Sequence, residues 1–188
     1  MDPAAGRLAW CTAMAEYPAH LIRHRALFNG TPVTIRPIRR EDSGMEQEFV
    51  RHLSEDSRYF RFMGSLRELP EKKLRSFTNI DYLRHMAFVA TIAQEGREIE
   101  IGAARYAATE APGVCEFAIV VDDAWQGSGV AGLLMTSLMH AARENGFKTM
   151  EGIVLATNQK MLKFARQFGF ERHHLPGEAD IVHIELQL

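Results

Sequence analysis

The sequence predicts an α/β protein with a mixed, mostly antiparallel central sheet flanked by helices and an N-terminal β-hairpin. Three observations predict this fold class. Strand-like segments flank Asn29-Gly30, three more follow one another in mid-chain, and strands alternate with helix-periodic segments in the last third. The 188 residues, 46% hydrophobic and 24% charged, fit one domain. We expect residues 17–188 to form it and residues 1–16 to be a flexible N-terminal arm.

The first expected element is the hairpin. The segments HLIRHRALF and TPVTIRPI flank Asn29-Gly30, and Asn-Gly between strand-like runs is typical of a type I′ turn. Pro32 and Pro37 lack the N–H that a central strand position requires. The second strand is therefore expected at a sheet edge, or with its prolines near its ends.

Three short helices are expected next. Asp42 or Ser43 can cap the first, in which apolar residues recur at helical spacing. Ser54 can cap the second. Pro70 suits the start of the third, because a proline in the first turn removes no helical hydrogen bond.

The remaining elements alternate between strands and helices. Strands are expected at residues 86–94, 98–109 and 114–122. The third is a near-continuous apolar run, which is typical of a strand buried on both faces. The rest of the chain is predicted to hold a helix over 127–145, a strand over 148–157, a helix capped by Asn158, and a strand over 181–188.

Charge and hydropathy argue against several classes of function. A formal net charge of -2 lacks the positive balance of a nucleic-acid-binding protein. The longest weakly polar segment, residues 129–142, is too short to cross a membrane. The N-terminus lacks the basic and apolar regions of a secretory signal. The sequence therefore predicts a cytoplasmic protein whose partners are neither nucleic acid nor membrane.

The cysteines and histidines predict neither a disulfide nor a metal site. Cys11 and Cys115 are far apart and form no CxxC pair. His173, His174 and His183 are interpreted as surface or strand residues, because a metal site needs three or four converging ligands. We expect reduced cysteines and no bound metal.

A glycine loop lies between an expected strand and the long helix. It comprises Gln126, Gly127, Ser128, Gly129, Val130 and Ala131. Glycines let several backbone N–H groups point inward, and the helix N-terminus adds partial positive charge, so the loop suits a diphosphate. With Gly132 the loop also matches G-x-G-x-x-G, but a dinucleotide-binding fold carries that motif after its first strand. From the glycines alone, a structural turn is the alternative.

Two segments together resemble one family. QGSGVA, residues 126–131, is similar to the GNAT N-acetyltransferase signature Q/R-x-x-G-x-G/A. NQKMLKFARQFGF, residues 158–170, resembles the second GNAT segment, an Asn-capped helix that ends in Gly-Phe. The pair at this separation is a far more specific signal than the glycine loop alone.

Further segments resemble one branch of that family. YPAHL, GTPVTIRPIRRED, LSEDSRYFRF, FTNIDYLRHMAFVA and CEFAIVVDDAWQGSGVA are similar to the acetyltransferase domain of bacterial Pat-type protein-lysine acetyltransferases, which acetylate acetyl-CoA synthetase and related ligases. This resemblance implies the GNAT fold and acetyl-CoA as co-substrate. It also implies a protein substrate with an exposed lysine, for example an acyl-CoA synthetase.

Acyl transfer to an amine needs a proton acceptor, because a lysine amine with a pKa of about 10.4 is almost fully protonated at neutral pH. Glu116 is the candidate general base. It is a carboxylate in an apolar strand just before the glycine loop, where burial is expected to raise its pKa. A glutamate that reaches solvent or pairs with an arginine is the alternative. The family resemblance places the general base at this position.

The resemblance also implies the cofactor contacts. Backbone groups of Ile119 and Val121 are implied to bind the pantetheine arm, and residues 126–131 the diphosphate. Asn158 is implied to contact the pantetheine amide as well as to cap its helix. Many GNAT enzymes protonate the leaving thiolate with a tyrosine at the position of Ala165. Here, either water supplies that proton or the thiolate leaves unassisted.

Three functions stay open on the sequence: a protein-lysine acetyltransferase that works by direct attack in a ternary complex, an acetyltransferase for small amines, and a non-catalytic acyl-CoA-binding sensor. Glu116 argues against the sensor. An acyl-cysteine at Cys115 is disfavoured, because no neighbouring histidine or asparagine pattern supports an activated thiol.

Overall fold

A computed structural model describes residues 16–174 and 177–188, so the predicted arm lies outside the described residues except for Glu16. The first half of the described chain holds η1 (Ala19–Leu21), β1 (Arg23–Ala26), β2 (Pro32–Pro37), η2 (Arg40–Asp42), α1 (Ser43–His52), α2 (Glu55–Phe62), α3 (Glu71–Thr78), β3 (His85–Gln94) and β4 (Arg97–Ala108). The second half holds β5 (Val114–Val121), η3 (Asp123–Trp125), α4 (Val130–Glu144), β6 (Thr149–Leu155), α5 (Gln159–Gln167), β7 (Glu171–His173) and β8 (Ile181–Gln187).

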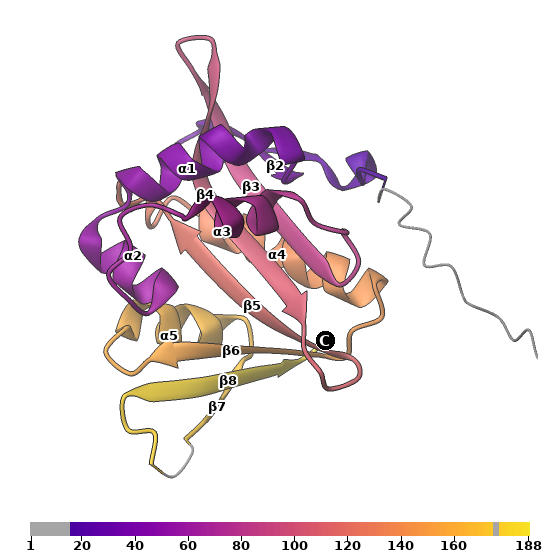
Figure 1. Ribbon diagram of the computed structural model, residues 1–188, viewed down its shortest axis with the longest axis vertical. Helices are drawn as coiled ribbons and strands as arrows, with labels where there is room; N and C mark the ends of the chain where they lie inside the picture. Colours follow the sequence, from indigo (N-terminus) through magenta and orange to yellow (C-terminus); the bar gives the residue numbers. More distant parts are fainter. Residues whose placement is uncertain (1–15, 175–176) are drawn as a thin grey trace, which may run out of the picture.

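Within the described residues, eight strands form one sheet in the order β1-β2-β3-β4-β5-β6-β8-β7 (Figure 1). Only β5 and β6 run parallel, and every other neighbouring pair is antiparallel. The mixed, mostly antiparallel sheet predicted from the sequence is therefore confirmed. The three-residue strand β7 was not predicted, because so short a segment carries no alternation to read.

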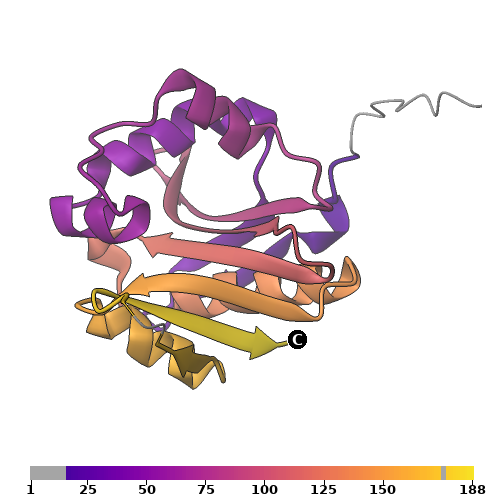
Figure 2. The same ribbon diagram turned by 60° about the horizontal axis from the view of Figure 1, so that its bottom comes forward.

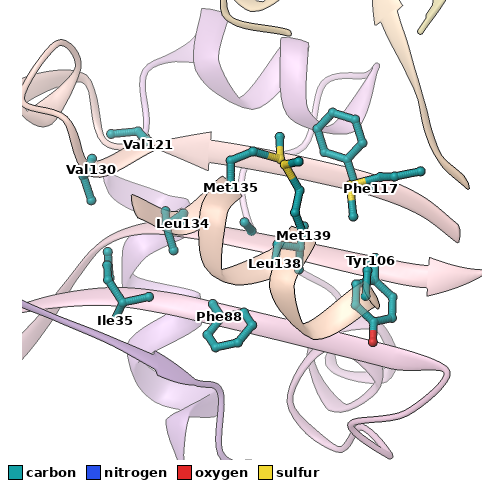
Figure 3. Close-up of a cluster of buried hydrophobic side chains, with 14 of the residues drawn as sticks. Ile35, Phe88, Tyr106, Phe117, Val121, Val130, Leu134, Met135, Leu138 and Met139 are labelled. Carbon is teal, nitrogen blue, oxygen red and sulfur yellow. The ribbon is translucent and has the colours of Figure 1, made fainter. Parts of the chain in front are cut away.

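Helices cover both faces of this sheet. Figures 1 and 2 show α1, α2 and α3 over one face and α4 over the other. The larger apolar cluster joins the sheet to α4 and α5, with Leu134 and Leu138 of α4 packed among strand residues such as Phe88 and Phe117 (Figure 3). A smaller cluster joins the opposite face to α1 and α3. The helices α1, α4 and α5 place buried apolar residues in these clusters, as the helical spacing of their apolar residues predicts, whereas α2 has no buried residue.

The N-terminal hairpin is present, but its turn differs from the type I′ prediction. Such a turn needs positive φ at both central residues. Here only Gly30, at φ 83°, has positive φ, and Asn29 does not. The N–H of Leu27 donates to the carbonyl of Thr31 at 2.9 Å, which closes a three-residue loop with glycine at its last position. Phe28 is the first residue of this loop, and its side chain is 86% exposed.

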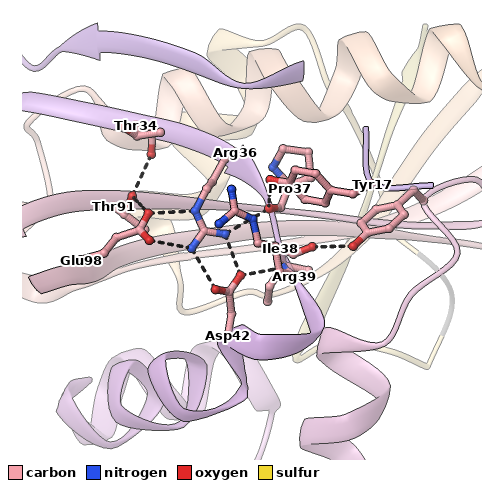
Figure 4. A network of polar contacts seen from close by, with 10 residues as sticks. Tyr17, Thr34, Arg36, Pro37, Ile38, Arg39, Asp42, Thr91 and Glu98 are labelled. Carbon is pink, nitrogen blue, oxygen red and sulfur yellow. Dashed lines mark hydrogen bonds and ion pairs between the residues drawn. The ribbon is translucent and has the colours of Figure 1, made fainter. Parts of the chain in front are cut away.

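A buried polar network fastens the hairpin to the rest of the sheet (Figure 4). The Arg36 guanidinium of β2 contacts Asp42 at 2.7 Å and Glu98 of β4 at 2.8 Å. Glu98 also accepts a hydrogen bond from the Thr91 hydroxyl of β3 at 2.7 Å. Burial alone would lower the pKa of Arg36, but the two carboxylates more than offset this and raise it. The ion pairs therefore leave this buried arginine charged.

Candidate active site

One large cavity, of about 980 Å³, opens between α2, α3, β5, β6 and α5. All but one of the predicted site residues line it: Glu116, Ile119, Val121, Gln126, Gly127, Gly129, Val130, Ala131 and Asn158. Ser128 does not line it, because its hydroxyl donates to the carbonyl of Trp125 at 2.6 Å. Two sequence segments about forty residues apart are therefore brought to one cavity, as phosphate and pantetheine binding would require.

The cavity exists because β5 and β6 part. Their pairing covers only residues 114–116 of β5 and 149–151 of β6. Beyond it, Gly152 admits the ring of Phe117, since a Cβ at this glycine would lie 2.9 Å from the Phe117 Cε1 atom. The prediction that β5 is buried on both faces is wrong. Its apolar run lines an open cleft on one side, as sequence alone does not show.

The backbone of β5 offers unpaired groups to this cleft. The N–H of Asp122 donates to Ile101 of β4 at 3.0 Å, and the Val114 carbonyl accepts from Thr109. Because neighbouring residues of a strand direct their backbone groups to opposite edges, the even-numbered positions of β5 face β4. Ile119 and Val121 then direct N–H and C=O toward the gap left by β6. This is the orientation that an extended amide-bearing chain needs to pair with β5.

The glycine loop turns directly into α4. Gly127 and Gly129 have φ of 77° and 97°, a region that other residues rarely adopt. The first N–H groups of α4, from Val130 onward, have no partner within their own helix, and the positive end of the helix dipole lies there. Both features favour a bound anion. Backbone groups of the loop and of the first turn of α4 therefore suit a diphosphate without any charged side chain.

Phe28 lies beside this loop, which sequence reasoning missed. Its N–H donates to the Ser128 carbonyl at 3.0 Å. Its ring lies against Gly129, where an added Cβ would be 3.0 Å from the ring. The requirement for glycine at this position therefore has two causes, backbone conformation and the ring. A Cβ added at Gly127, by contrast, would meet open space.

Glu116 lies near the start of β5, on the face that α2 and α3 cover. It lines the cavity but is exposed, so the burial expected for it is not found. An open cavity replaces the apolar surroundings that the strand sequence suggested. The carboxylate can therefore accept a proton from a bound acceptor or from water. Arg61 of α2 also lines the cavity, and the charge of Glu116 raises the pKa of this arginine against larger opposing effects.

Cys115 lies next to Glu116 but points to the opposite face. It is fully buried, and its Sγ lies 3.7 Å from the Thr149 carbonyl oxygen. Burial, with a smaller effect from the charge of Glu151, raises the pKa of this thiol to about 12. A protonated, inaccessible thiol does not act as a nucleophile, in agreement with the interpretation from sequence.

The position of the missing tyrosine is also buried. Ala165 is 1% exposed and belongs to the core under α5. None of the four tyrosines lines the cavity. Tyr82 and Tyr106 donate their hydroxyls to backbone carbonyls elsewhere. No tyrosine of this chain is thus placed to protonate a leaving group in the cavity.

Together, a strand pair that parts, a glycine loop at a helix N-terminus and a carboxylate on the open strand define an acyl-CoA-dependent N-acyltransferase. The chain matches the Acetyltransferase (GNAT) family over residues 48–170. It belongs to this family. It is an acetyl-CoA-dependent N-acyltransferase, and the mixed sheet with flanking helices is the GNAT fold.

Similar proteins agree with this assignment. Acetyltransferase PA5475 of Pseudomonas aeruginosa is 37% identical over 159 residues, which cover 84% of this chain and 86% of that protein. The GNAT domain of S. lividans PAT superposes with a TM-score of 0.84 at 31% identity, covering 92% of this chain and all of that one. A cAMP-binding acyltransferase from Mycobacterium smegmatis shares the fold at 24% identity and a TM-score of 0.59, with 90% of this chain spanning 49% of that one.

No helix of residues 16–174 and 177–188 has both the length and the apolar character needed to cross a bilayer.

Several cavity-lining residues carry no motif from which the sequence could have predicted them. They come from α2, the segment after it, and α3, and comprise Phe60, Arg61, Phe62, Met63 and Lys73.

Proposed function

We propose that this chain transfers the acetyl group of acetyl-CoA to a lysine side chain of a protein by direct attack in a ternary complex, with Glu116 as general base. The observation that carries the proposal is the position of Glu116, exposed in the cavity where β5 and β6 part. The similarity to the S. lividans PAT domain supports a protein acceptor, for which an acyl-CoA synthetase is the first candidate.

The other cavity carboxylates are less suited to the task. Asp123 accepts hydrogen bonds from the Ser54 N–H at 3.0 Å and from the Ser57 hydroxyl at 2.8 Å. Burial alone would raise the pKa of Asp123, but these bonds lower it, so its carboxylate is a weaker base. Asp56 lies in the first turn of α2, away from the strands that form the cleft. Glu116 alone lies on the open strand.

The proposed reaction uses the chain's own groups as follows. Glu116 takes a proton from the amine, directly or through water, while the amine nitrogen bonds to the thioester carbon. A backbone N–H of β5 that faces the β6 gap polarises the carbonyl oxygen. The C–S bond then breaks. Water protonates the thiolate, which is a tolerable leaving group because a free thiol has a pKa of about 8.5.

Glu116→Gln tests the base. A positioned general base contributes about 10² to 10⁴ in rate, so the variant should lose that much kcat/KM at neutral pH. Its affinity for acetyl-CoA should stay unchanged, because backbone groups of other residues bind the cofactor. The deficit should shrink toward pH 10, where the amine is neutral without help. The pH–rate profile is measured on an acyl-CoA synthetase and on lysine peptides, and a ratio that stays constant with pH removes Glu116 from the mechanism.

Glu185→Gln is the matched control. Glu185 lies on the same sheet, two strands from β5, and does not line the cavity. The Glu185→Gln variant removes the same charge as Glu116→Gln and should leave kcat/KM unchanged. Turnover of free amines without turnover of any protein or peptide would instead indicate a small-molecule acetyltransferase.

A further inference from the structure

Two cations from different helices lie inside the cavity. Arg61 lies in the last turn of α2 and Lys73 belongs to α3, and both line the same cavity as Glu116. The two charges lie over the same pair of rings. The Arg61 Cζ atom is 5.0 Å from the centre of the Phe62 ring and 5.8 Å from that of Phe77. The Lys73 Nζ atom is 4.9 and 5.7 Å from the same centres. The rings hold both cations in place through their negative faces.

Neither cation has an acidic partner among the residues that the structure describes. The ion pairs found there do not include Arg61 or Lys73. The neighbouring Arg105 is different, because Glu46 of α1 neutralises it at 3.0 Å. Two unneutralised positive charges at one place in a partly apolar cavity repel each other, and this cost is removed when an anion binds between them.

The pKa values of Arg61 and Lys73 are both lowered by burial and by neighbouring positive charges. Burial, and to a smaller extent the charge of Arg105, lower the pKa of Arg61 to about 10 against smaller opposite effects of Glu46 and Glu116. Burial also lowers the pKa of Lys73, as do the charges of Arg61 and Arg105. Arg61 nevertheless stays charged at neutral pH. Its planar guanidinium matches a carboxylate with two parallel hydrogen bonds.

We propose that Arg61 and Lys73 form a binding site for a carboxylate carried by the acyl acceptor. The inference rests on the proposed function, because the amine of that acceptor must reach Glu116 in the same cavity. A chain that presents a lysine amine to Glu116 passes α2 and α3, where an adjacent acidic side chain meets the two cations. The acceptor lysines of this enzyme are therefore those with a glutamate or aspartate close by.

Matched peptides test this inference. One set carries glutamates on both sides of a single lysine, and the other carries glutamines at those positions. The wild type should acetylate the glutamate peptides with a kcat/KM at least tenfold higher. Lys73→Glu should abolish this preference and favour arginine-flanked peptides instead. Lys72→Glu is the control: it makes the same charge change on α3, but Lys72 is exposed and does not line the cavity. It should keep the wild-type preference.

The remaining outcomes separate this inference from its rivals. Arg61→Gln serves as a second, charge-removing variant, and thermal melts check folding. Equal rates on both peptide sets for the wild type overturn the inference, while leaving lysine acetylation intact. A loss of CoA affinity in Lys73→Glu and Arg61→Gln, measured by calorimetry with peptide preference unchanged, also overturns it, because the cations then bind a cofactor phosphate. If no peptide reacts but free amino acids do, with the same dependence on Lys73, the carboxylate site stands and the protein acceptor is rejected.

Discussion

At the scale of single residues, the glycine loop shows how one position can satisfy two constraints. Gly129 combines a φ of 97° with a ring against its Cα. The motif in the sequence identified the position but gave only one cause, close approach of a diphosphate. The second cause, Phe28, comes from a hairpin a hundred residues earlier. A sequence motif does not report such a neighbour, because hairpin tips carry no periodic signal.

Gly129→Val is expected to weaken CoA binding by tenfold or more, which corresponds to about 1.4 kcal/mol. The valine strains a backbone that needs positive φ and also pushes Phe28 away from the loop. Calorimetry with CoA measures the effect. Adding Phe28→Ala to the variant separates the two causes, because it removes the ring and leaves the strain. Unchanged affinity in folded Gly129→Val would show that the loop does not bind the diphosphate.

At the scale of helices and strands, most of the fold was predictable. Asn158 caps α5 as predicted, accepting a hydrogen bond from the Met161 N–H at 3.0 Å. Ser54 caps α2 in the same way at 3.1 Å. Caps and periodicity are local, so one sequence suffices to place them. The bounds of the long helix were less accurate, since residues 127–129 belong to the phosphate loop and α4 begins at Val130.

The candidate site was predictable only on its cofactor side. The glycine loop, the next strand and the capping asparagine follow one another in the order typical of the GNAT segments. The cofactor residues could therefore be proposed from their spacing. The acceptor side depends on how α2 and α3 dock over β5, and this docking uses apolar contacts without a motif. Arg61 and Lys73 look like ordinary surface cations in the sequence. Only the tertiary structure brings them into the cavity with Glu116.

The separation of β5 from β6 depends on a single small residue. Gly152→Ala would place a methyl group 2.9 Å from the Phe117 ring, which is buried and packs on Phe170 at a centroid distance of 5.0 Å. Overpacking of this kind costs about 1–3 kcal/mol. Denaturant unfolding should show this loss, and calorimetry should show weaker CoA binding as Phe117 moves into the cleft. Phe117→Leu in the same chain should restore stability. No loss in either measurement would mean that the cleft does not depend on this contact.

At the scale of the whole molecule, the net charge of -2 conceals two carboxyls on β4, the partly exposed Glu98 and the buried Glu100, whose pKa values are shifted in opposite directions. Glu98 is hydrogen-bonded to Arg36, and this interaction lowers the pKa of Glu98 despite an opposing effect of burial. Glu100, two residues further on, is 4% exposed, and neither of its oxygens has a hydrogen-bond partner among the described residues. Burial, together with the nearby Glu46 carboxylate, raises the pKa of Glu100 well above its usual value. Of the two β4 carboxyls, Glu98 and Glu100, Glu100 is therefore the one that holds a proton.

These opposite shifts predict opposite effects of pH on folding stability. For Glu98, the stabilisation is present above its ordinary pKa near 4.5 and is lost as pH falls through its lower folded pKa. Glu98→Gln should thus reduce the free energy of unfolding at neutral pH, and the difference from wild type should shrink in acid. Glu98→Gln is the matched comparison for Glu100→Gln, because both variants make the same chemical change on β4.

Glu100→Gln should behave in the opposite sense. The folded protein keeps the Glu100 proton while the unfolded chain releases it above about pH 4.5, so wild-type stability falls as pH rises toward the folded pKa, with a limiting slope of about 1.4 kcal/mol per pH unit. Glutamine mimics the protonated acid and does not titrate. The variant should therefore match the wild type near pH 4 and become progressively more stable than it at higher pH. Urea unfolding from pH 4 to 8 measures both curves, and a difference that stays constant across this range would show that Glu100 is ionised in the folded protein.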